Sequence, residues 1–169
     1  MKHSILAILQ NLIDALRNEL QQYGEMLALL DHQQELVRHR GADDILHSIS
    51  EINSQSATIQ TAREARKLAQ SQLAGSLAQS EDSTFTNLIP LIPGQYRPLV
   101  TALIQENNEL LLRVRQRAQQ NQLLLTRSLE LMQRFITTLS PQEQAAPSGK
   151  EGIPVLVEEP GSLLYDAIM

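Results

Sequence analysis

The residues in this chain that most readily carry out chemistry are its histidines, at His3, His32, His39 and His47. His32 and His39 lie seven residues apart, so a helix would place both side chains on one face. Zinc-binding histidines on a helix more usually lie four residues apart, with a carboxylate close by. We therefore interpret the histidines as exposed polar side chains, and we predict that the chain binds no metal and no cofactor.

The acidic and nucleophilic side chains show no arrangement typical of an active site. The acidic residues are scattered, and nothing places two carboxylates together in an apolar cleft for general acid–base catalysis. The sequence has no nucleophile elbow, no phosphate-binding glycine loop and no dinucleotide fingerprint. It also has no cysteine, which excludes disulfides and thiolate metal sites. We predict that the protein is not an enzyme.

Three arginines form a basic cluster at Arg113, Arg115 and Arg117. A helix would place Arg113 and Arg117 on one face and turn Arg115 elsewhere. A nucleic-acid-binding protein is usually basic overall, whereas this chain has a net charge of -5 and a pI of about 5.3. We expect these arginines to pair with acidic neighbours or to be solvated, and we predict no nucleic-acid partner.

The elements that would position any site are long helices. Leu, Ala, Glu, Lys, Arg and Gln make up more than half of the 169 residues. Most of these residues favour helices because they lose little side-chain freedom there. Aromatic residues are only 3% of the chain, but Leu and Ile alone can fill the narrow seam between packed helices. The composition predicts an all-α protein of the coiled-coil type.

The first helix is predicted from about residue 4 to residue 40. Its apolar residues recur at steps of three and four, with one final step of seven, which places them along one stripe. They are Ile5, Leu9, Leu12, Leu16, Leu20, Tyr23, Leu27, Leu30 and Val37. Gly41 follows three cations and precedes Asp43 and Asp44, a pattern that favours a helix end and a new start. We predict a chain reversal at 41–43; one continuous, kinked helix is the alternative.

Two further helices are predicted, at about 44–79 and 98–139, joined by a proline- and glycine-rich connector at 80–97. The stripe of the last helix reads Leu99, Leu103, Glu106, Leu110, Val114, Arg117, Asn121, Leu124, Ser128, Leu131, Phe135 and Thr138. Leucine triplets at 110–112 and 123–125 widen its apolar face, so that the helix can contact two neighbours. Residues 1–140 are therefore predicted to form an elongated antiparallel three-helix bundle or coiled-coil hairpin.

Residues 141–169 are rich in Pro, Gly, Glu and Gln, and we expect a flexible, acidic C-terminal tail. The tail carries a net charge of -4, whereas residues 97–140 carry +3. It contains two apolar islands, at 153–157 and 163–169, and either docks on the basic helix or stays solvated. No stretch of the chain approaches the roughly 18 apolar residues that a membrane span needs. We predict a soluble, cytoplasmic protein that does not insert into membranes.

Three segments resemble the FlgN family of cytoplasmic flagellar export chaperones. Residues 121–131, reading NQLLLTRSLEL, are similar to its Asn-x-x-Leu-Leu pattern. Residues 35–43, reading ELVRHRGAD, resemble its helix–Gly/Asp–helix junction. Residues 164–167, reading LYDA, are similar to a short tyrosine motif found late in the family. That motif is usually followed by a glycine, whereas Ile168 and Met169 follow it here.

The resemblance implies a chaperone of hook-associated proteins, which form the hook–filament junction. Such a chaperone keeps the helix-forming segments of these proteins from associating early and delivers them to the flagellar type III export apparatus. The resemblance places partner binding in the last helix and tail, at Leu124, Leu125, Leu131, Phe135 and Tyr165. Asn121 falls on the predicted seam, where one asparagine can fix register and partner choice. The alternative interpretation of these leucines is ordinary bundle core.

Two other functions stay open from the sequence. A structural coiled-coil or tether protein would use the same seam to assemble with itself. A chaperone or regulator of a different secretion system would bind another class of partner. The sequence leaves open which partner is bound, and whether the protein is a monomer or a dimer.

Overall fold

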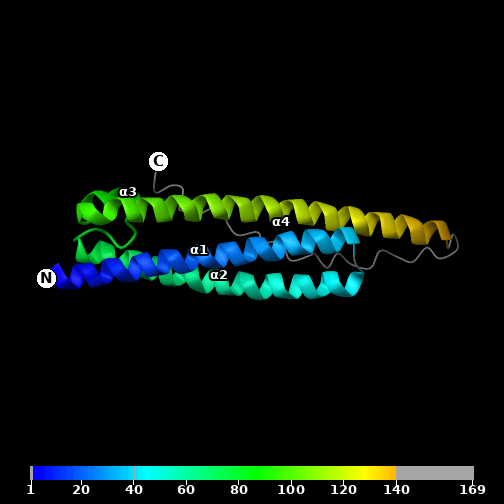
Figure 1. Ribbon diagram of the computed structural model, residues 1–169, viewed down its shortest axis with the longest axis horizontal. Coiled ribbons are helices and arrows are strands. Elements are labelled where there is room, and N and C mark those ends of the chain that lie inside the picture. The colour runs from blue at the N-terminus through cyan, green and yellow to red at the C-terminus, as the bar shows by residue number, and fades with distance from the viewer. Residues whose placement is uncertain (1, 40, 140–169) are drawn as a thin grey trace.

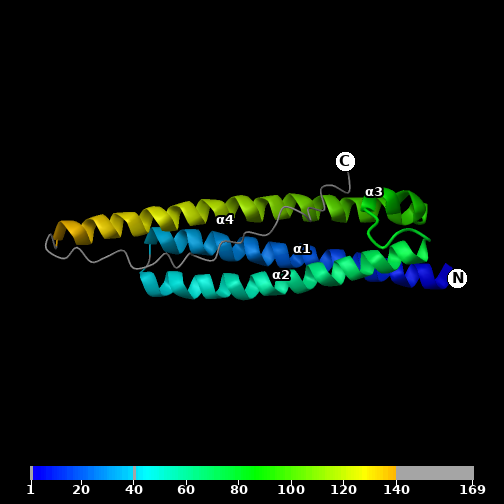
Figure 2. The same cartoon turned by 180° about the vertical axis from the view of Figure 1, so that it is seen from behind.

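The computed structural model describes residues 2–39 and 41–139 of the chain. Three long helices dominate it: α1 (Lys2–His39), α2 (Ala42–Ser76) and α4 (Arg97–Leu139). They lie side by side in an elongated bundle, with α1 between α2 and α4 (Figure 1). The view from behind shows the same order (Figure 2). The predicted all-α bundle is confirmed, and the described residues contain no strand.

The chain reverses direction at Gly41, between the end of α1 at His39 and the start of α2 at Ala42. Gly41 is the N-cap residue of α2 in an extended conformation and makes no side-chain cap. Asp43 and Asp44 lie in the first turn of α2, where the positive end of the helix dipole favours acidic side chains. The two helices form an antiparallel hairpin, as predicted, and not one kinked helix.

Helix α1 is the central element of the bundle. Its backbone lies close to those of both α2 and α4, whereas α2 and α4 approach each other closely at few points. Two apolar clusters fill the interior. The cluster at the connector end includes Leu9, Leu12, Leu16, Leu73, Phe85, Val100 and Ile104, and the cluster nearer the reversal includes Tyr23, Met26, Leu30, Ile52, Ile59, Leu111 and Val114.

Two buried asparagines set the register between α1 and α4. The Asn107 side-chain amide donates a hydrogen bond of 3.0 Å to the Leu16 carbonyl, and that of Asn121 donates one of 2.7 Å to the Leu30 carbonyl. Both bonds join residues 91 positions apart. The two helices therefore run parallel at a constant offset, and another register would leave the amides without these acceptors.

The seam of α4 differs at two positions from the stripe predicted from sequence. Leu99 and Glu106 are exposed, whereas Asn107 is fully buried. The inner stripe runs from Leu103 to Asn107 and then to Leu110, a step of four followed by a step of three. This path leaves the carboxylate of Glu106 in water, which avoids the large cost of burying an unpaired charge.

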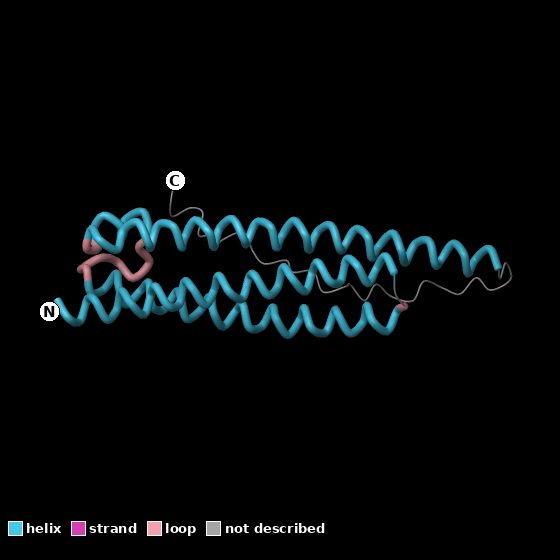
Figure 3. The backbone as a smooth tube through the Cα atoms, in the orientation of Figure 1, coloured by secondary structure: helices cyan, strands magenta, loops and turns pink. Residues whose placement is uncertain are grey.

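The connector between α2 and α4 closes one end of the bundle. It holds α3 (Phe85–Leu88) and two short 3-10 helices, η1 (Ile89–Leu91) and η2 (Gly94–Tyr96). Figure 3 shows its loops at the end that also holds the N-terminus. Phe85, Leu88 and Ile92 are buried there. The Arg97 guanidinium donates hydrogen bonds to the carbonyls of Ile92 (3.0 Å) and Pro90 (2.6 Å), which ties the connector to the start of α4.

Candidate partner-binding surface

The other end of the bundle is open because α4 is longer than its neighbours. With an offset of 91 residues, the end of α1 at His39 falls opposite position 130 of α4. Every residue from 126 to 139 is exposed. Figure 1 shows the end of α4, coloured yellow to orange, projecting beyond the reversal between α1 and α2; by the offset of 91, residues 131–139 extend past the end of α1. We call residues 126–139 the C-terminal overhang.

The C-terminal overhang is amphipathic although all its residues are exposed. Its large apolar side chains are 51–66% exposed, and they are Leu129, Leu131, Met132, Phe135, Ile136 and Leu139. Its larger polar side chains face the other way, and they are Arg127, Glu130, Gln133 and Arg134. Monomeric proteins rarely expose a large contiguous apolar patch unless it serves an interaction. The C-terminal overhang is therefore the candidate partner-binding surface.

The residues predicted from sequence to bind a partner fall in two environments. Leu131 and Phe135 lie on the C-terminal overhang and are each 65% exposed. Asn121 and Leu125 are buried between the helices, and Leu124 is half-buried. A partner cannot reach the two buried side chains while the bundle is closed. The structure thus brings Leu131 and Phe135 together on an accessible surface and places Asn121 in the α1–α4 seam.

Four apolar residues of the surface were not singled out from sequence, and one predicted residue is not among those that the structure describes. Leu129, Met132, Ile136 and Leu139 complete the exposed apolar face. They belong to a second line of apolar positions beside the predicted stripe, and their spacing of three and four residues is the signal that identifies them. Tyr165 lies outside the described residues.

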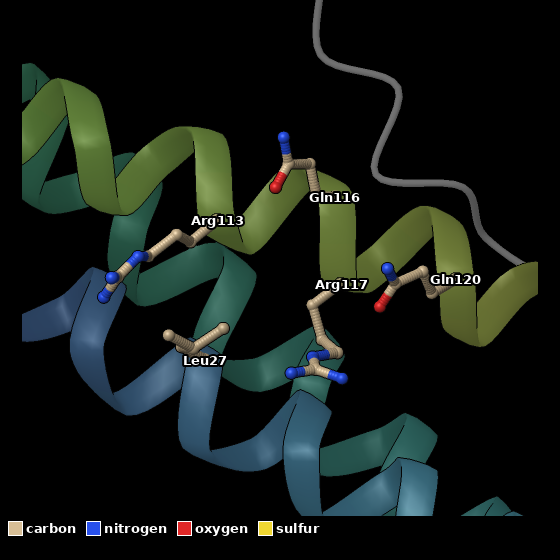
Figure 4. A pocket seen from close by; sticks show the side chains of 5 residues that line it. All are labelled: Leu27, Arg113, Gln116, Arg117 and Gln120. Atoms are coloured by element: carbon tan, nitrogen blue, oxygen red, sulfur yellow. The ribbon is translucent and has the colours of Figure 1, made fainter.

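A shallow groove of about 250 Å³ lies between α1 and α4, lined by Leu27, Arg113, Gln116, Arg117 and Gln120 (Figure 4). The Arg117 guanidinium contacts the Asp31 carboxylate at 2.8 Å and donates a 2.7 Å hydrogen bond to the Gln34 side chain. The predicted pairing with an acidic neighbour is therefore confirmed for Arg117. The groove is open and mostly polar, unlike the concave apolar pockets that bind small molecules.

A buried polar cluster lies in the middle of the α1–α2 hairpin. The Glu19 carboxylate accepts hydrogen bonds from the Tyr23 hydroxyl (2.8 Å) and the Arg66 guanidinium (3.0 Å), and Arg66 also donates to Gln70. Burial and then the charge of Glu19 raise the pKa of Tyr23 far above its ordinary value, despite an opposing effect of Arg63. Because these side chains are enclosed between helices, we assign the cluster a structural role.

None of the described helices is long and apolar enough to cross a lipid bilayer. Within the same described residues, no group of three or more His, Asp or Glu side chains is arranged to hold a metal ion. The exposed apolar face of α4 is the main candidate binding surface of the described structure, and an amphipathic helical segment of a partner protein could pack against it.

Comparison with known proteins identifies the family of this chain. A family model described as FlgN protein matches residues 1–150, which include all three long helices and the connector. No match was found among curated proteins or among solved structures. Proteins of the matched family are flagellar export chaperones, a class whose work is to bind other flagellar proteins. The chain therefore belongs to the FlgN family of flagellar export chaperones.

Proposed function

We propose that this protein is a cytoplasmic chaperone for hook-associated proteins, the proteins of the hook–filament junction. It binds their helix-forming segments through the C-terminal overhang, prevents early association of these segments, and delivers the proteins to the flagellar type III export apparatus. The observation that carries the proposal is the exposed apolar face of residues 126–139 in a member of this family.

Amphipathic helices bind by laying their apolar faces against a complementary apolar surface. The six exposed apolar side chains of the C-terminal overhang form such a surface, and no described residue competes for it. The aromatic ring of Phe135 is well suited as an anchor, because large buried side chains contribute most of the binding energy at interfaces.

The proposal is tested by calorimetric titration of the purified full-length protein with each hook-associated protein encoded in the same genome. The double variant Leu131→Lys/Phe135→Lys should bind at least ~30-fold more weakly, because losing interface anchors costs on the order of 2 kcal/mol. Its matched control is Gln133→Lys/Thr137→Lys, which adds the same charges at the same spacing on the polar face and should bind within about twofold of wild type. Equal binding by all three proteins would remove the C-terminal overhang from the function.

A structural coiled-coil or tether protein is the second candidate, since an exposed apolar helix face also permits self-assembly. This function predicts that the purified protein forms larger assemblies as its concentration rises. Light scattering coupled to size-exclusion chromatography distinguishes the two functions. A single small species across a hundredfold range of concentration supports the chaperone, and growth into filaments or large oligomers supports the tether.

A further inference from the structure

Helix α4 follows a seven-residue repeat, and four of its seven lines of side chains are turned inward within the bundle. Two of these lines face α1. The line of Asn107 and Asn121 bonds to α1 carbonyls, and the line of Arg117 bonds to Asp31 and Gln34 of α1. We call these two lines the α1-side rows.

The other two inward lines face α2. The groove of Figure 4 lies along one flank of α4, and these two lines lie on the opposite flank. On that flank Ile104 and Asn108 are buried, and Ile104 belongs to the same apolar cluster as Ala69 and Leu73 of α2. We call the lines that start at Ile104 and Asn108 the α2-side rows.

Both pairs of rows continue without a break into the C-terminal overhang. The α1-side rows reach Ser128, Leu131, Phe135 and Thr138, and the α2-side rows reach Leu129, Met132, Ile136 and Leu139. The three outer rows hold only polar residues there: Thr126, Arg127, Glu130, Gln133, Arg134 and Thr137. The apolar face of the C-terminal overhang is therefore as wide as the face that α4 buries against two helices.

We infer that the partner supplies two helices, which continue the lines of α1 and α2 beside residues 131–139 and extend the three-helix bundle by about two and a half turns. This inference rests on the proposed function and specifies the partner of the same surface. A single helix placed like α1 or like α2 would cover one pair of rows and leave the other pair in water. Apolar surface stabilises a complex only where it is buried, by roughly 25 cal/mol per Å². The exposed pair of rows would therefore contribute nothing to binding.

The tail of this chain and a second copy of the protein fit this surface less well than two partner helices. The tail of this chain contains apolar islands of five and seven residues, shorter than the stretch of α4 at 131–139 that extends past α1. Pro154, Pro160 and Gly161 lie within or between them, and proline and glycine oppose helix formation. A second copy would bring only one C-terminal overhang, which is one helix and not two.

The charged residues at the ends of α1 and α2 indicate which charges two partner helices stacked on them would carry. The last turn of α1 carries Arg38 and His39, and the first turn of α2 carries Asp43 and Asp44. All four are exposed. Helices stacked end to end with their dipoles aligned would bring an acidic first turn to the end of α1 and a basic last turn to the start of α2. The partner is therefore an antiparallel pair of amphipathic helices with these charges at its tip.

The test uses three matched double variants of the full-length protein, titrated with purified hook-associated proteins. Leu131→Lys/Phe135→Lys alters the α1-side rows, Met132→Lys/Ile136→Lys alters the α2-side rows, and Gln133→Lys/Thr137→Lys alters the outer face. Each pair has a spacing of four residues, and all the replaced side chains are exposed, so the fold should be retained in a circular dichroism melt. The first variant should bind at least ~30-fold more weakly and the second at least ~10-fold more weakly, whereas the third should bind within about twofold of wild type.

Loss of binding in only one of the first two variants would overturn the two-helix partner while leaving the chaperone function intact. Undiminished binding in both would overturn the two-helix partner and the placement of the surface. A wild-type protein that binds no hook-associated protein would overturn the inference and the proposed function together.

Cross-linking gives an independent measurement, because the chain has no cysteine of its own. Single cysteines replace Thr138, on the α1-side rows, and Leu139, on the α2-side rows, and each carries a benzophenone label. The two labels should cross-link to two different segments of the partner, separated by a turn. Cross-links from both positions to one continuous helix, to the tail of the same chain, or to a second copy would contradict the inference.

Discussion

The two parts of α4 differ in environment but share one pattern. Residues 97–125 and residues 126–139 both place apolar side chains on the inward rows of the same seven-residue repeat. In the first part most of these side chains are buried against α1 and α2, whereas in the C-terminal overhang they are exposed. The difference arises from where the neighbouring helices end, at His39 and Ala42. One pattern thus produces a stable core where neighbours are present and a binding surface where they are absent.

The largest loss of stability is expected when the buried Glu19 carboxylate loses an ion pair. Replacing Arg66 with alanine leaves the Glu19 carboxylate, 0% exposed, without its ion-pair partner. Breaking a buried ion pair in this way should lower the free energy of unfolding by about 3–5 kcal/mol. The matched variant Arg134→Ala in the C-terminal overhang should change it by less than ~0.5 kcal/mol. Urea denaturation measures both, and an equal loss in the two variants would contradict the comparison.

The next effect compares two isoleucines of α4. Ile104 is 0% exposed and Ile136 is 62% exposed. Ile104→Ala should lower the free energy of unfolding by about 3 kcal/mol, since it removes buried methyl groups and leaves a cavity. Ile136→Ala should leave stability within ~0.5 kcal/mol of wild type. A substantial loss of stability in Ile136→Ala would mean that the C-terminal overhang is covered in the free protein.

Much of this contrast could be predicted from sequence, because periodicity determines which face of a helix is apolar. The spacing of leucines and the stop–start pattern around Gly41 indicated the helices and their reversal. The sequence could not indicate where the last helix loses its neighbours, since that depends on the offset between α1 and α4. The offset is fixed by Asn107 and Asn121; the predicted stripe included Asn121 but missed Asn107 in favour of Glu106.

The buried polar cluster of Glu19, Tyr23 and Arg66 was also not predicted, because it too depends on contacts between helices. Arg63 and Arg66 belong to a stretch of α2 whose inward positions are mainly alanines, such as Ala62 and Ala69. Small side chains leave space between helices, and here long arginine side chains occupy it. A pattern of apolar residues alone cannot show that a charged side chain turns inward, because this depends on a partner such as Glu19 from another helix.

A smaller effect is expected from pH. The pKa of Tyr23 is raised above its ordinary value of 10.0 in the folded protein, so the folded state holds this proton more tightly than the unfolded chain. The stabilising contribution is fully present below about pH 10 and is lost as the pH rises further, by at most about 1.4 kcal/mol per pH unit. Thermal melts between pH 8 and pH 11 should show this decline, and Tyr23→Phe should flatten it. An identical decline in the variant would show that another group titrates.

Substitutions in the C-terminal overhang should change stability least. They should weaken the binding of a partner instead. The measurement that tests this most directly is hydrogen–deuterium exchange of the full-length protein with and without a bound hook-associated protein. We predict that amides of residues 126–139 become strongly protected in the complex, while those of residues 97–125 change little. Protection confined to the connector, the groove or the reversal, with unchanged exchange at 126–139, would contradict the account.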